Sequence, residues 1–387
     1  MQTSAFSAVR GDLLSCYTTS IAQYMQQVAI DYQFAIGTQL FLAVRSATDT
    51  YPYLSIVHQH TPLIGEQLTH TLALSLCHTT DWQSFMQSLE GQCEVYHAVI
   101  VIGDTYALPW LTSYQKKHAP HWFMITHRDQ QTRCFYVNDC FEFTDETGTQ
   151  HPFVGWIQDQ QLEQCLRMTV VPTFLQQQRS QWALGTHIDT ATIRNQEYQW
   201  FESTASRPNQ IDGESLFFTL LVKTWRQHMG QEHCSHLPAA EWHCGLQGLQ
   251  FMAEHLSGSR DDPRIYEMRD DIWVMARNRQ LFAHVVDKMG KALKNEHLKE
   301  YAMWYEQFLI PSWQTLPRIM HYNMQCLQRK RTISSLLSST LQQVLEQETE
   351  AMRRLQSILE LTRFWRVEAE KEILESDRPC PSSDAIA

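Results

Sequence analysis

A histidine and an aspartate frame a short segment whose composition predicts a β-hairpin. His121 opens one aromatic and β-branched stretch, Asp139 ends a second, and the polar loop 128–132 separates them. If Thr126–His127 pair with Arg133–Cys134, His121 lies directly opposite Asp139. Opposed residues on one face of a sheet have Cβ atoms about 5 Å apart, so an imidazole–carboxylate hydrogen bond is within reach. Such a carboxylate fixes the tautomer and orientation of a histidine that acts as a general base.

A histidine base needs a nucleophile, and the best candidate lies upstream at Cys16. Ser15 is the candidate N-cap of a helical pattern, which places Cys16 in the first turn. The unpaired backbone N–H groups and the positive dipole end of such a turn favour a thiolate and can bind an oxyanion. On position alone, a small buried cysteine with a structural role is an equally weighted alternative.

The composition limits the compartment and the partners. The chain has 387 residues, a net charge of -11 and no long basic block, which argues against nucleic acid as a partner. The first residues show no secretory signal, and the apolar runs are too short to span a bilayer. The ten cysteines are therefore interpreted mostly as reduced thiols. The sequence predicts a cytoplasmic protein without a membrane partner.

The residues that could do chemistry fall in a region that mixes helix and strand. A helix is expected from Cys16, strands at 39–44, at 95–103 and in the hairpin, and a short helix at 81–89. A helix followed by a mostly antiparallel sheet is typical of an α+β domain, which we assign to residues 1–155.

Helical patterns dominate residues 156–377, which we expect to form an all-α bundle. The expected helices span 159–168, 212–225, 246–256, 264–293, 297–326 (bent or broken near Pro311 and Pro317) and 337–365. They either cover the sheet or form the seam of a homodimer, and the sequence leaves both open. Residues 172–210 are polar and predicted to have weak order, and residues 378–387 form a predicted disordered tail.

Three segments in order resemble the N-terminal domain of the butirosin biosynthesis protein H-like (BtrH-like) family. They are SCYTTSIAQYM from Ser15, GDTYALPWLTSYQKKHAPHWFMI from Gly103 and FYVNDCFEF from Phe135. The helical region, notably MARNRQLFAHVV and EQFLIPSWQTLPRI, is more loosely similar to the family's C-terminal domain.

The resemblance implies a papain-like fold with a triad of Cys16 as nucleophile, His121 as base and Asp139 as orienting group. It also implies acyl transfer in specialised-metabolite biosynthesis. An acyl, aminoacyl or peptidyl group would pass from the phosphopantetheine thioester of a carrier protein to Cys16, and then to an amine. No cofactor is bound in this scheme, and the partners are the carrier protein and a small-molecule amine.

Two other readings remain open. The same triad could discharge the acyl group to water or to an internal nucleophile, as a thioesterase or an off-loading cyclase does. Alternatively, the protein is a non-catalytic scaffold that binds a carrier protein. The scaffold reading is supported by Ser15, which stands where family members usually have a histidine. That missing histidine is its only support. A separate difference from papain-like enzymes is that no glutamine in Ala8–Ser15 can help hold an oxyanion, so the backbone N–H of Cys16 would have to do more.

Other residues have weaker signals. Asp104 and Tyr106 could contact the amine substrate, or Asp104 could cap a turn while Tyr106 packs. Five residues could ligate a metal, but they fit no standard zinc motif and no metal is predicted; they are His233, Cys234, His236, His243 and Cys244. The basic clusters 116–118 and 329–331 are either solvated surface or steering sites for an acidic carrier protein.

Overall fold

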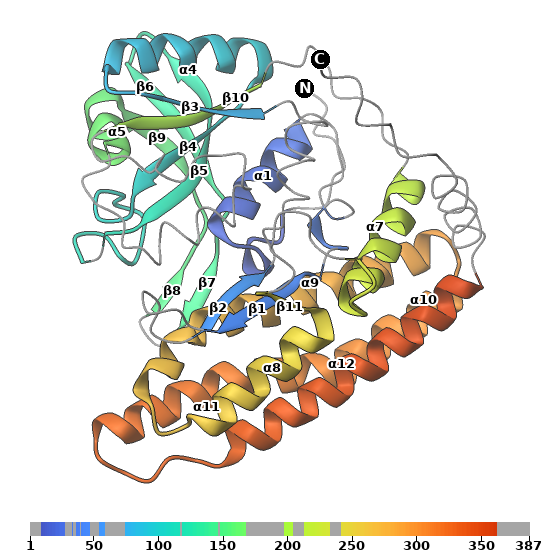
Figure 1. The fold of residues 1–387 in the computed structure, drawn as a ribbon. Helices are drawn as coiled ribbons and strands as arrows, with labels where there is room; N and C mark the ends of the chain where they lie inside the picture. The colour runs from blue at the N-terminus through green and yellow to red at the C-terminus, as the bar shows by residue number, and fades with distance from the viewer. Residues whose placement is uncertain are drawn as a thin grey trace, which may run out of the picture.

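The computed structural model describes 11 segments of the chain. These are residues 9–27, 33, 36–38, 40–46, 54–58, 74–116, 118–145, 148–167, 197–203, 213–232 and 241–361. Within them the protein combines helices and sheets, with the largest sheet at one end and a set of long helices at the other (Figure 1).

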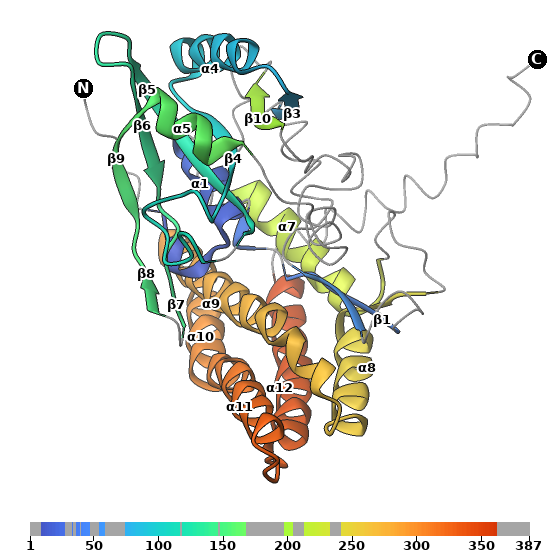
Figure 2. The ribbon, with the colours of Figure 1, turned by 90° about the vertical axis from the view of Figure 1, so that its left-hand side faces the viewer.

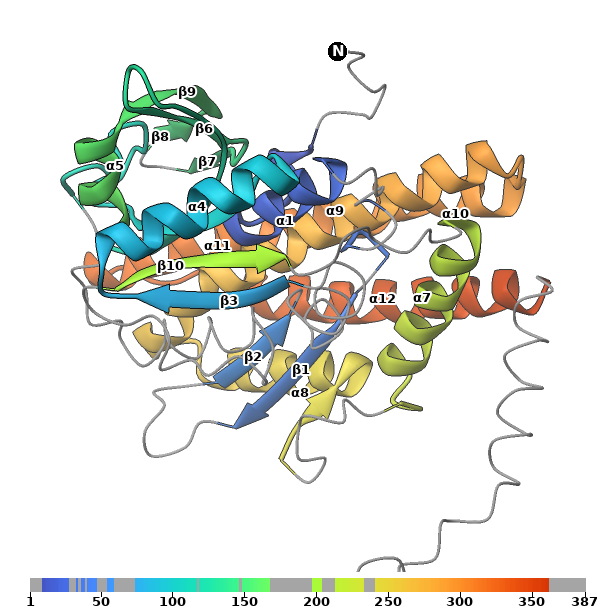
Figure 3. The ribbon, with the colours of Figure 1, turned by 90° about the horizontal axis from the view of Figure 1, so that it is seen from above.

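A six-stranded sheet organises the region around the hairpin (Figures 1 and 3). All its pairings are antiparallel. In spatial order, its strands are β3 (Leu74–Thr79), β10 (Tyr198–Ser203), β4 (Val99–Asp104), β5 (Pro120–Asp129), β6 (Cys134–Asp139) and β9 (Phe153–Gln158).

Helices cover both faces of this sheet. Ile100 and Ile102 of β4 pack in one apolar cluster with α1 (Cys16–Gln27). Val99 and Val101 alternate with them and pack in a second cluster with α4 (Trp82–Tyr96) and α5 (Asp159–Leu166). A strand that is buried on both faces reads as a continuous apolar run, which is why β4 is so evident in the sequence.

Two smaller sheets connect this region to the helices. One contains β11 (His243–Cys244), β1 (Leu42–Ser46) and β2 (Leu54–His58). The other is the hairpin of β7 (Phe143–Asp145) and β8 (Gly148–Gln150), which extends from the large sheet toward α9 (Figure 2).

The long helices pack side by side at the end opposite α4 (Figures 1 and 2). They are α7 (Gly213–His228), α8 (Gly245–Gly258), α9 (Arg269–Ala292), α10 (Glu296–Trp304), α11 (Ile310–Gln328) and α12 (Leu336–Glu360), with the short helices η1 (Gly11–Leu13) and η3 (Pro263–Met268). One apolar cluster runs from Leu13 in η1 and Tyr17 in α1 to Leu359 in α12, so the sheet region and the helices share a core.

The predicted bend near Pro311 is a change of helix type. Residues Tyr305–Leu309 (η4) form a π-helical turn directly before Pro311, and Pro317 lies inside α11. Proline lacks an N–H and clashes with the preceding turn, so a wider turn beside it relieves the main chain. The apolar face of α12, including Leu341 and Leu355, is buried within this chain.

Three expectations about the elements are wrong. The predicted boundary at residue 155 falls inside β9, and β10 inserts between β3 and β4, so residues 156–377 are not all helical. The strand expected from Val95 begins at Val99, because α4 continues to Tyr96. His97, which lies inside the stretch expected as a strand, is instead the exposed C-cap of α4, with a left-handed φ of 59°.

Some expectations fall on residues outside the described ones. These include the tail 378–387, most of the polar segment 172–210, and Asp212 as a helix cap. Within the described part of the chain, no helix is long and apolar enough to cross a membrane. The eight described cysteines are all free thiols.

Candidate active site

Cys16 is the first residue of α1, as the sequence predicts. The Ser15 hydroxyl accepts the N–H of Thr18 at 3.2 Å, and Thr18 Oγ1 accepts the N–H of Ser15 at 2.9 Å. This reciprocal capping satisfies two backbone donors and defines the start of the helix. The half-buried thiol therefore lies at the positive end of the α1 dipole.

His121 and Asp139 are hydrogen-bonded, although the predicted register is wrong. His121 Nε2 lies 2.7 Å from Asp139 Oδ2, and both side chains are almost fully buried. Met124 pairs with Asn138, and a bulge between Ile125 and His127 shifts the pairing nearer the turn. His121 is therefore a diagonal neighbour of Asp139 on the same face of the hairpin. Diagonal neighbours are about 7–8 Å apart, still within the reach of an imidazole and a carboxylate.

Two further donors fix the Asp139 carboxylate. The indole Nε1–H of Trp110 donates to Asp139 Oδ2 at 2.8 Å, and the N–H of Phe141 donates to Oδ1 at 3.1 Å. Both donors are neutral, so they orient the carboxylate without cancelling its charge. Asp139 thus keeps its charge available to His121.

Cys16 lies close enough to His121 to influence its pKa, through its charge and through a hydrogen bond to the ring. Because Nε2 is bound to Asp139, Nδ1 is the ring nitrogen left for the thiol. Burial lowers the pKa of His121, but the negative charges of Asp139 and Cys16 and the hydrogen bonds to both outweigh burial and raise this pKa to about 10. The geometry therefore favours an imidazolium beside the sulfur at neutral pH, an arrangement that activates a cysteine nucleophile.

The neighbouring Cys140 has the opposite environment. Burial, followed by the charge of Asp139, raises the pKa of Cys140 to about 11. Its sulfur accepts a hydrogen bond from the amide of Gln23 at 2.9 Å. Cys140 thus remains a protonated thiol near the site and serves as an internal control for the reactivity of Cys16.

Asp104 and Tyr106 contact each other and His118. Asp104 accepts the N–H of Tyr106 at 3.0 Å and lies 2.8 Å from His118 Nδ1. The Tyr106 ring stacks on His118 with centroids 4.2 Å apart. These contacts agree with the alternative in which Asp104 caps a turn and Tyr106 packs. A substrate-binding role for the two residues stays a prediction.

Sequence reasoning missed Trp110 and Gln150. The buried Gln150 side chain accepts the N–H of Thr112 at 2.9 Å and donates to the carbonyl of Trp110 at 3.2 Å, which fixes the loop that carries the indole. Trp110 also stacks on Phe153, with centroids 4.7 Å apart. The signal for Trp110 was present in the segment DTYALPW, but its partner could not be identified from spacing.

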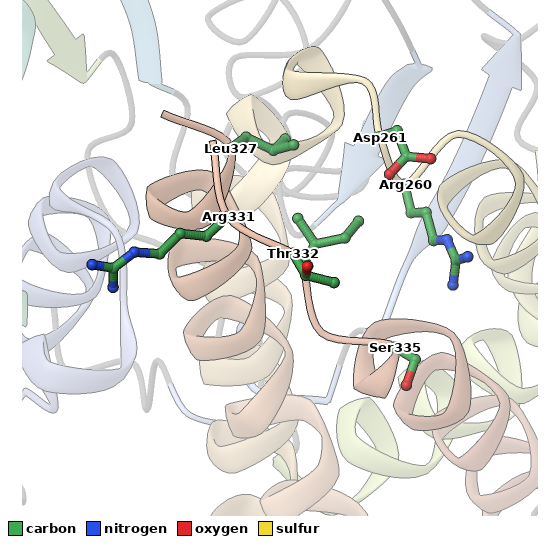
Figure 4. Close-up of a pocket in the computed structure, with 7 residues that line it drawn as sticks. Arg260, Asp261, Leu327, Arg331, Thr332 and Ser335 are labelled. Atoms are coloured by element: carbon green, nitrogen blue, oxygen red, sulfur yellow. The ribbon is translucent and has the colours of Figure 1, made fainter. Parts of the chain in front are cut away.

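Among the described residues, the remaining candidates form no second site. No group of three metal-binding side chains occurs among the described residues; His233, Cys234 and His236 lie outside them. Of the basic clusters, Arg331 lines an open pocket of about 440 Å³ with Arg260. Figure 4 shows their guanidinium groups pointing away from each other, so the two charges do not converge on one ligand.

Comparison with known proteins adds no family assignment: no family model matches the chain, and neither does any curated protein sequence.

Proposed function

We propose that this protein is a papain-like cysteine acyltransferase. It would accept an acyl, aminoacyl or peptidyl group from the phosphopantetheine thioester of a carrier protein and deliver it to an amine. One observation carries the proposal: the half-buried Cys16 at the start of α1 contacts His121, whose other ring nitrogen is bound to the buried Asp139. The arrangement of α1 against an antiparallel sheet supports the papain-like assignment, as does the resemblance of three segments to the BtrH-like family.

Each residue has a role in the proposed reaction. The Cys16 thiolate attacks the thioester carbonyl, and the backbone N–H of Cys16, at the positive end of the α1 dipole, stabilises the oxyanion. The tetrahedral intermediate collapses to acyl-Cys16, and the imidazolium of His121 protonates the departing pantetheine thiol. The amine then attacks acyl-Cys16, His121 takes its proton, and the amide leaves as the thiolate re-forms. Asp139 holds His121 in the required orientation throughout.

The chemistry suits a thiol nucleophile. Exchange between two thioesters is nearly balanced in energy, so acyl-Cys16 forms readily and remains reactive toward an amine. Ser15, which replaces the usual histidine of the family, caps α1 and so maintains the position of Cys16.

The test is intact-protein mass spectrometry after mixing the protein with an acyl-loaded carrier protein. The wild type should gain the mass of the acyl group, Cys16→Ala should not, and Cys140→Ala should behave like the wild type. Addition of candidate amines should then remove the adduct and produce an amide. Release of free acid at the same rate without an amine would identify a thioesterase instead. Binding of the loaded carrier without any adduct would reject catalysis and support the scaffold reading.

A further inference from the structure

An arginine from the helical region reaches the Cys16 site. Arg277 lies on α9, and only 5% of its surface is exposed. Its Nη2 donates to the carbonyl of Gly11 at 2.5 Å and to the carbonyl of Glu142 at 3.1 Å. Gly11 opens the turn that leads to Cys16, and Glu142 follows the strand that ends at Asp139. Arg277 therefore links the two segments that carry the nucleophile and the orienting carboxylate.

The segment that leads to Cys16 and the segment that follows Asp139 approach each other closely. A Cβ on Gly11 would lie 1.8 Å from the carbonyl oxygen of Cys140, so only glycine fits between η1 and the end of β6. The Phe141 ring lies near both polar groups, 5.6 Å from the His121 ring and 6.0 Å from the Arg277 guanidinium carbon. The guanidinium is therefore packed against the same aromatic side chain as the histidine of the site.

Most of the hydrogen-bonding capacity of Arg277 is unused. A guanidinium has five N–H donors, and the two on Nη2 bind the carbonyls of Gly11 and Glu142. Nε and Nη1, which carry the other three, have no hydrogen-bond partner among the described residues. The flat face of the group lies over Trp273, with the guanidinium carbon 4.3 Å from the ring centroid. A buried cation in this state costs free energy unless a negative charge lies nearby.

Asp12, Glu142 and Cys16 are the groups that act electrostatically on Arg277. Burial lowers the pKa of Arg277 to about 9, and the charges of Asp12, Glu142 and Cys16 oppose that effect. At neutral pH the guanidinium is therefore charged. Asp12 is itself bound by Arg10, through contacts of 2.8 and 2.7 Å. Electrostatic attraction is mutual, so a cation stabilised by the charge on Cys16 stabilises that charge in turn.

We propose that Arg277 is a positioning residue that stabilises negative charge on the Cys16 sulfur, so that the reactive site is assembled from the sheet region and from α9. This inference rests on the proposed role of Cys16 as nucleophile. It also supplies a source of thiolate stabilisation in a chain that has Ser15 before the cysteine. The helical region is then required for reactivity and not only for stability.

The test compares two alkylating reagents of different charge on the full-length protein. Iodoacetamide is neutral and iodoacetate is anionic, so the ratio of their rates at Cys16 reports the local positive potential. The rates are followed at pH 7 by mass spectrometry of the peptide that contains Cys16. We expect Arg277→Met to lower the ratio of iodoacetate to iodoacetamide rates about fivefold, and Arg277→Lys to keep most of it.

A matched control separates local from global charge. Arg264 is an arginine paired with Asp262 at the surface, and Arg264→Met changes the net charge by the same amount. It should leave the ratio unchanged. If Arg277→Met does not fold, Arg277→Gln removes the same charge in a polar side chain and should lower the ratio in the same way. A ratio that neither variant lowers would overturn the proposal. A wild-type ratio equal to that of N-acetylcysteine amide, a neutral model thiol, would also overturn it.

The two proposals fail in different ways. Alkylation requires no carrier protein and so tests Arg277 separately. If the ratio of alkylation rates depends on Arg277 but no acyl transfer occurs, the role of Arg277 is retained and the acyltransferase is rejected. If acyl transfer goes through Cys16 but the ratio of alkylation rates does not depend on Arg277, the acyltransferase is retained and the role of Arg277 is rejected. A merely structural role would slow both reagents equally in Arg277→Met, and Arg277→Lys would then show the same ratio as Arg277→Met.

Discussion

Two arginines of α9 lie in two different buried clusters. Each guanidinium lies over a tryptophan: Arg277 over Trp273 at 4.3 Å, and Arg279 over Trp313 at 4.4 Å. Arg279 donates its Nε–H to Glu348 at 2.7 Å, whereas the hydrogen bonds of Arg277 go to main-chain carbonyls. The arginine inside the bundle is therefore neutralised by a carboxylate that it touches, and the arginine beside the candidate site is held by uncharged groups.

Each cluster also contains a buried histidine, and the two histidines differ in charge. His228 Nε2 is 3.7 Å from Glu348, but Arg279 shares that carboxylate. Burial lowers the pKa of His228 to about 4, with Glu348 opposing the effect and Arg279 adding to it. For His121, by contrast, Asp139 and Cys16 outweigh burial and raise the pKa to about 10.

The comparison separates a balanced cluster from an unbalanced one. In the bundle, one cation and one anion cancel and the histidine is neutral. In the candidate site, His121 and Arg277 are positive while Asp139 supplies one negative charge. Asp12 and Glu142 also oppose the effect of burial on Arg277. Under our proposal, a negative charge on the Cys16 sulfur adds to them, because buried charges are stable only when they are paired. The predictions below test whether the first cluster acts in stability and the second in chemistry.

The largest effect is expected on acyl transfer when each histidine is removed. His121→Ala should lower the transfer rate by about 10²–10⁴-fold, because the proton donor and acceptor is lost. His228→Ala should retain most of the transfer rate at a temperature where it is folded. Single-turnover transfer from a loaded carrier, with circular dichroism to confirm folding, measures both. Equal losses in the two variants would remove the distinction between the clusters.

The largest effect on stability is expected at Glu348. Glu348→Gln leaves Arg279 buried without its counter-charge, which should cost about 3–5 kcal/mol of unfolding free energy. Glu346→Gln, two residues earlier on α12, changes an exposed side chain bonded to Gln342 and should stay within about 0.5 kcal/mol. Urea denaturation followed by fluorescence measures both variants. A loss of transfer in folded Glu348→Gln would show that the bundle cluster also acts in chemistry.

The two histidines should give pH dependences of opposite sign. The raised pKa of His121 means that the folded state binds its proton more tightly than the unfolded state, whose pKa is about 6.5. Its contribution to stability is therefore complete below about pH 6.5 and is lost as the pH rises through about 10. The lowered pKa of His228 gives a contribution that is complete above about pH 6.5 and is lost as the pH falls toward about 4.

Urea denaturation across pH measures this difference. Subtracting the unfolding free energy of His121→Gln from that of the wild type should give a curve that falls between pH 6.5 and 10, with a span of a few kcal/mol at most. The same subtraction for His228→Gln should give a curve that rises between pH 4 and 6.5. Parallel curves would contradict the assignment of a charged His121 and a neutral His228.

Much of the candidate site could be predicted from the sequence, because it depends on contacts between residues that are close together in the chain. The start of α1 at Cys16 follows from Ser15 and Thr18, which cap each other within one turn. The contact of His121 with Asp139 depends only on two strands joined by a short loop. Even so, the bulge near Thr126 moved the register, and the prediction of contact survived because a diagonal pair is also within reach.

The rest could not be predicted because it depends on contacts between distant segments. Strand β10 enters the large sheet from more than ninety residues beyond β4, a pairing that periodicity does not reveal. Arg277 lies in a helical pattern that looks like any amphipathic helix. Its role appears only when α9 is placed against Gly11 and Glu142. The burial of the Arg277 side chain, and its N–H groups without a hydrogen-bond partner, result from the packing of the folded chain and so cannot be predicted from the helical pattern alone.

The smallest effects on transfer rate and stability are expected when the indole N–H that binds the carboxylate of each cluster is removed. Trp110 donates to Asp139 at 2.8 Å, and Trp313 donates to Glu348 at 2.8 Å. Replacement by phenylalanine keeps an aromatic ring and removes the donor, a loss of about 0.5–1.5 kcal/mol for one hydrogen bond. In Trp110→Phe this loss should appear mainly as a transfer rate lower by about two- to tenfold, because Asp139 orients His121 less firmly.

The same change in the bundle should have a different outcome. Trp313→Phe should lower the unfolding free energy and leave the transfer rate of the folded protein near that of the wild type, since Glu348 has no contact with Cys16 in the proposed chemistry. Trp156→Phe, at an exposed ring on β9, is the control for loss of an indole and should change neither quantity. If Trp110→Phe lowered stability alone, its bond to Asp139 would be structural, and the orientation of His121 would have to depend on Phe141 N–H and on the packing of the hairpin.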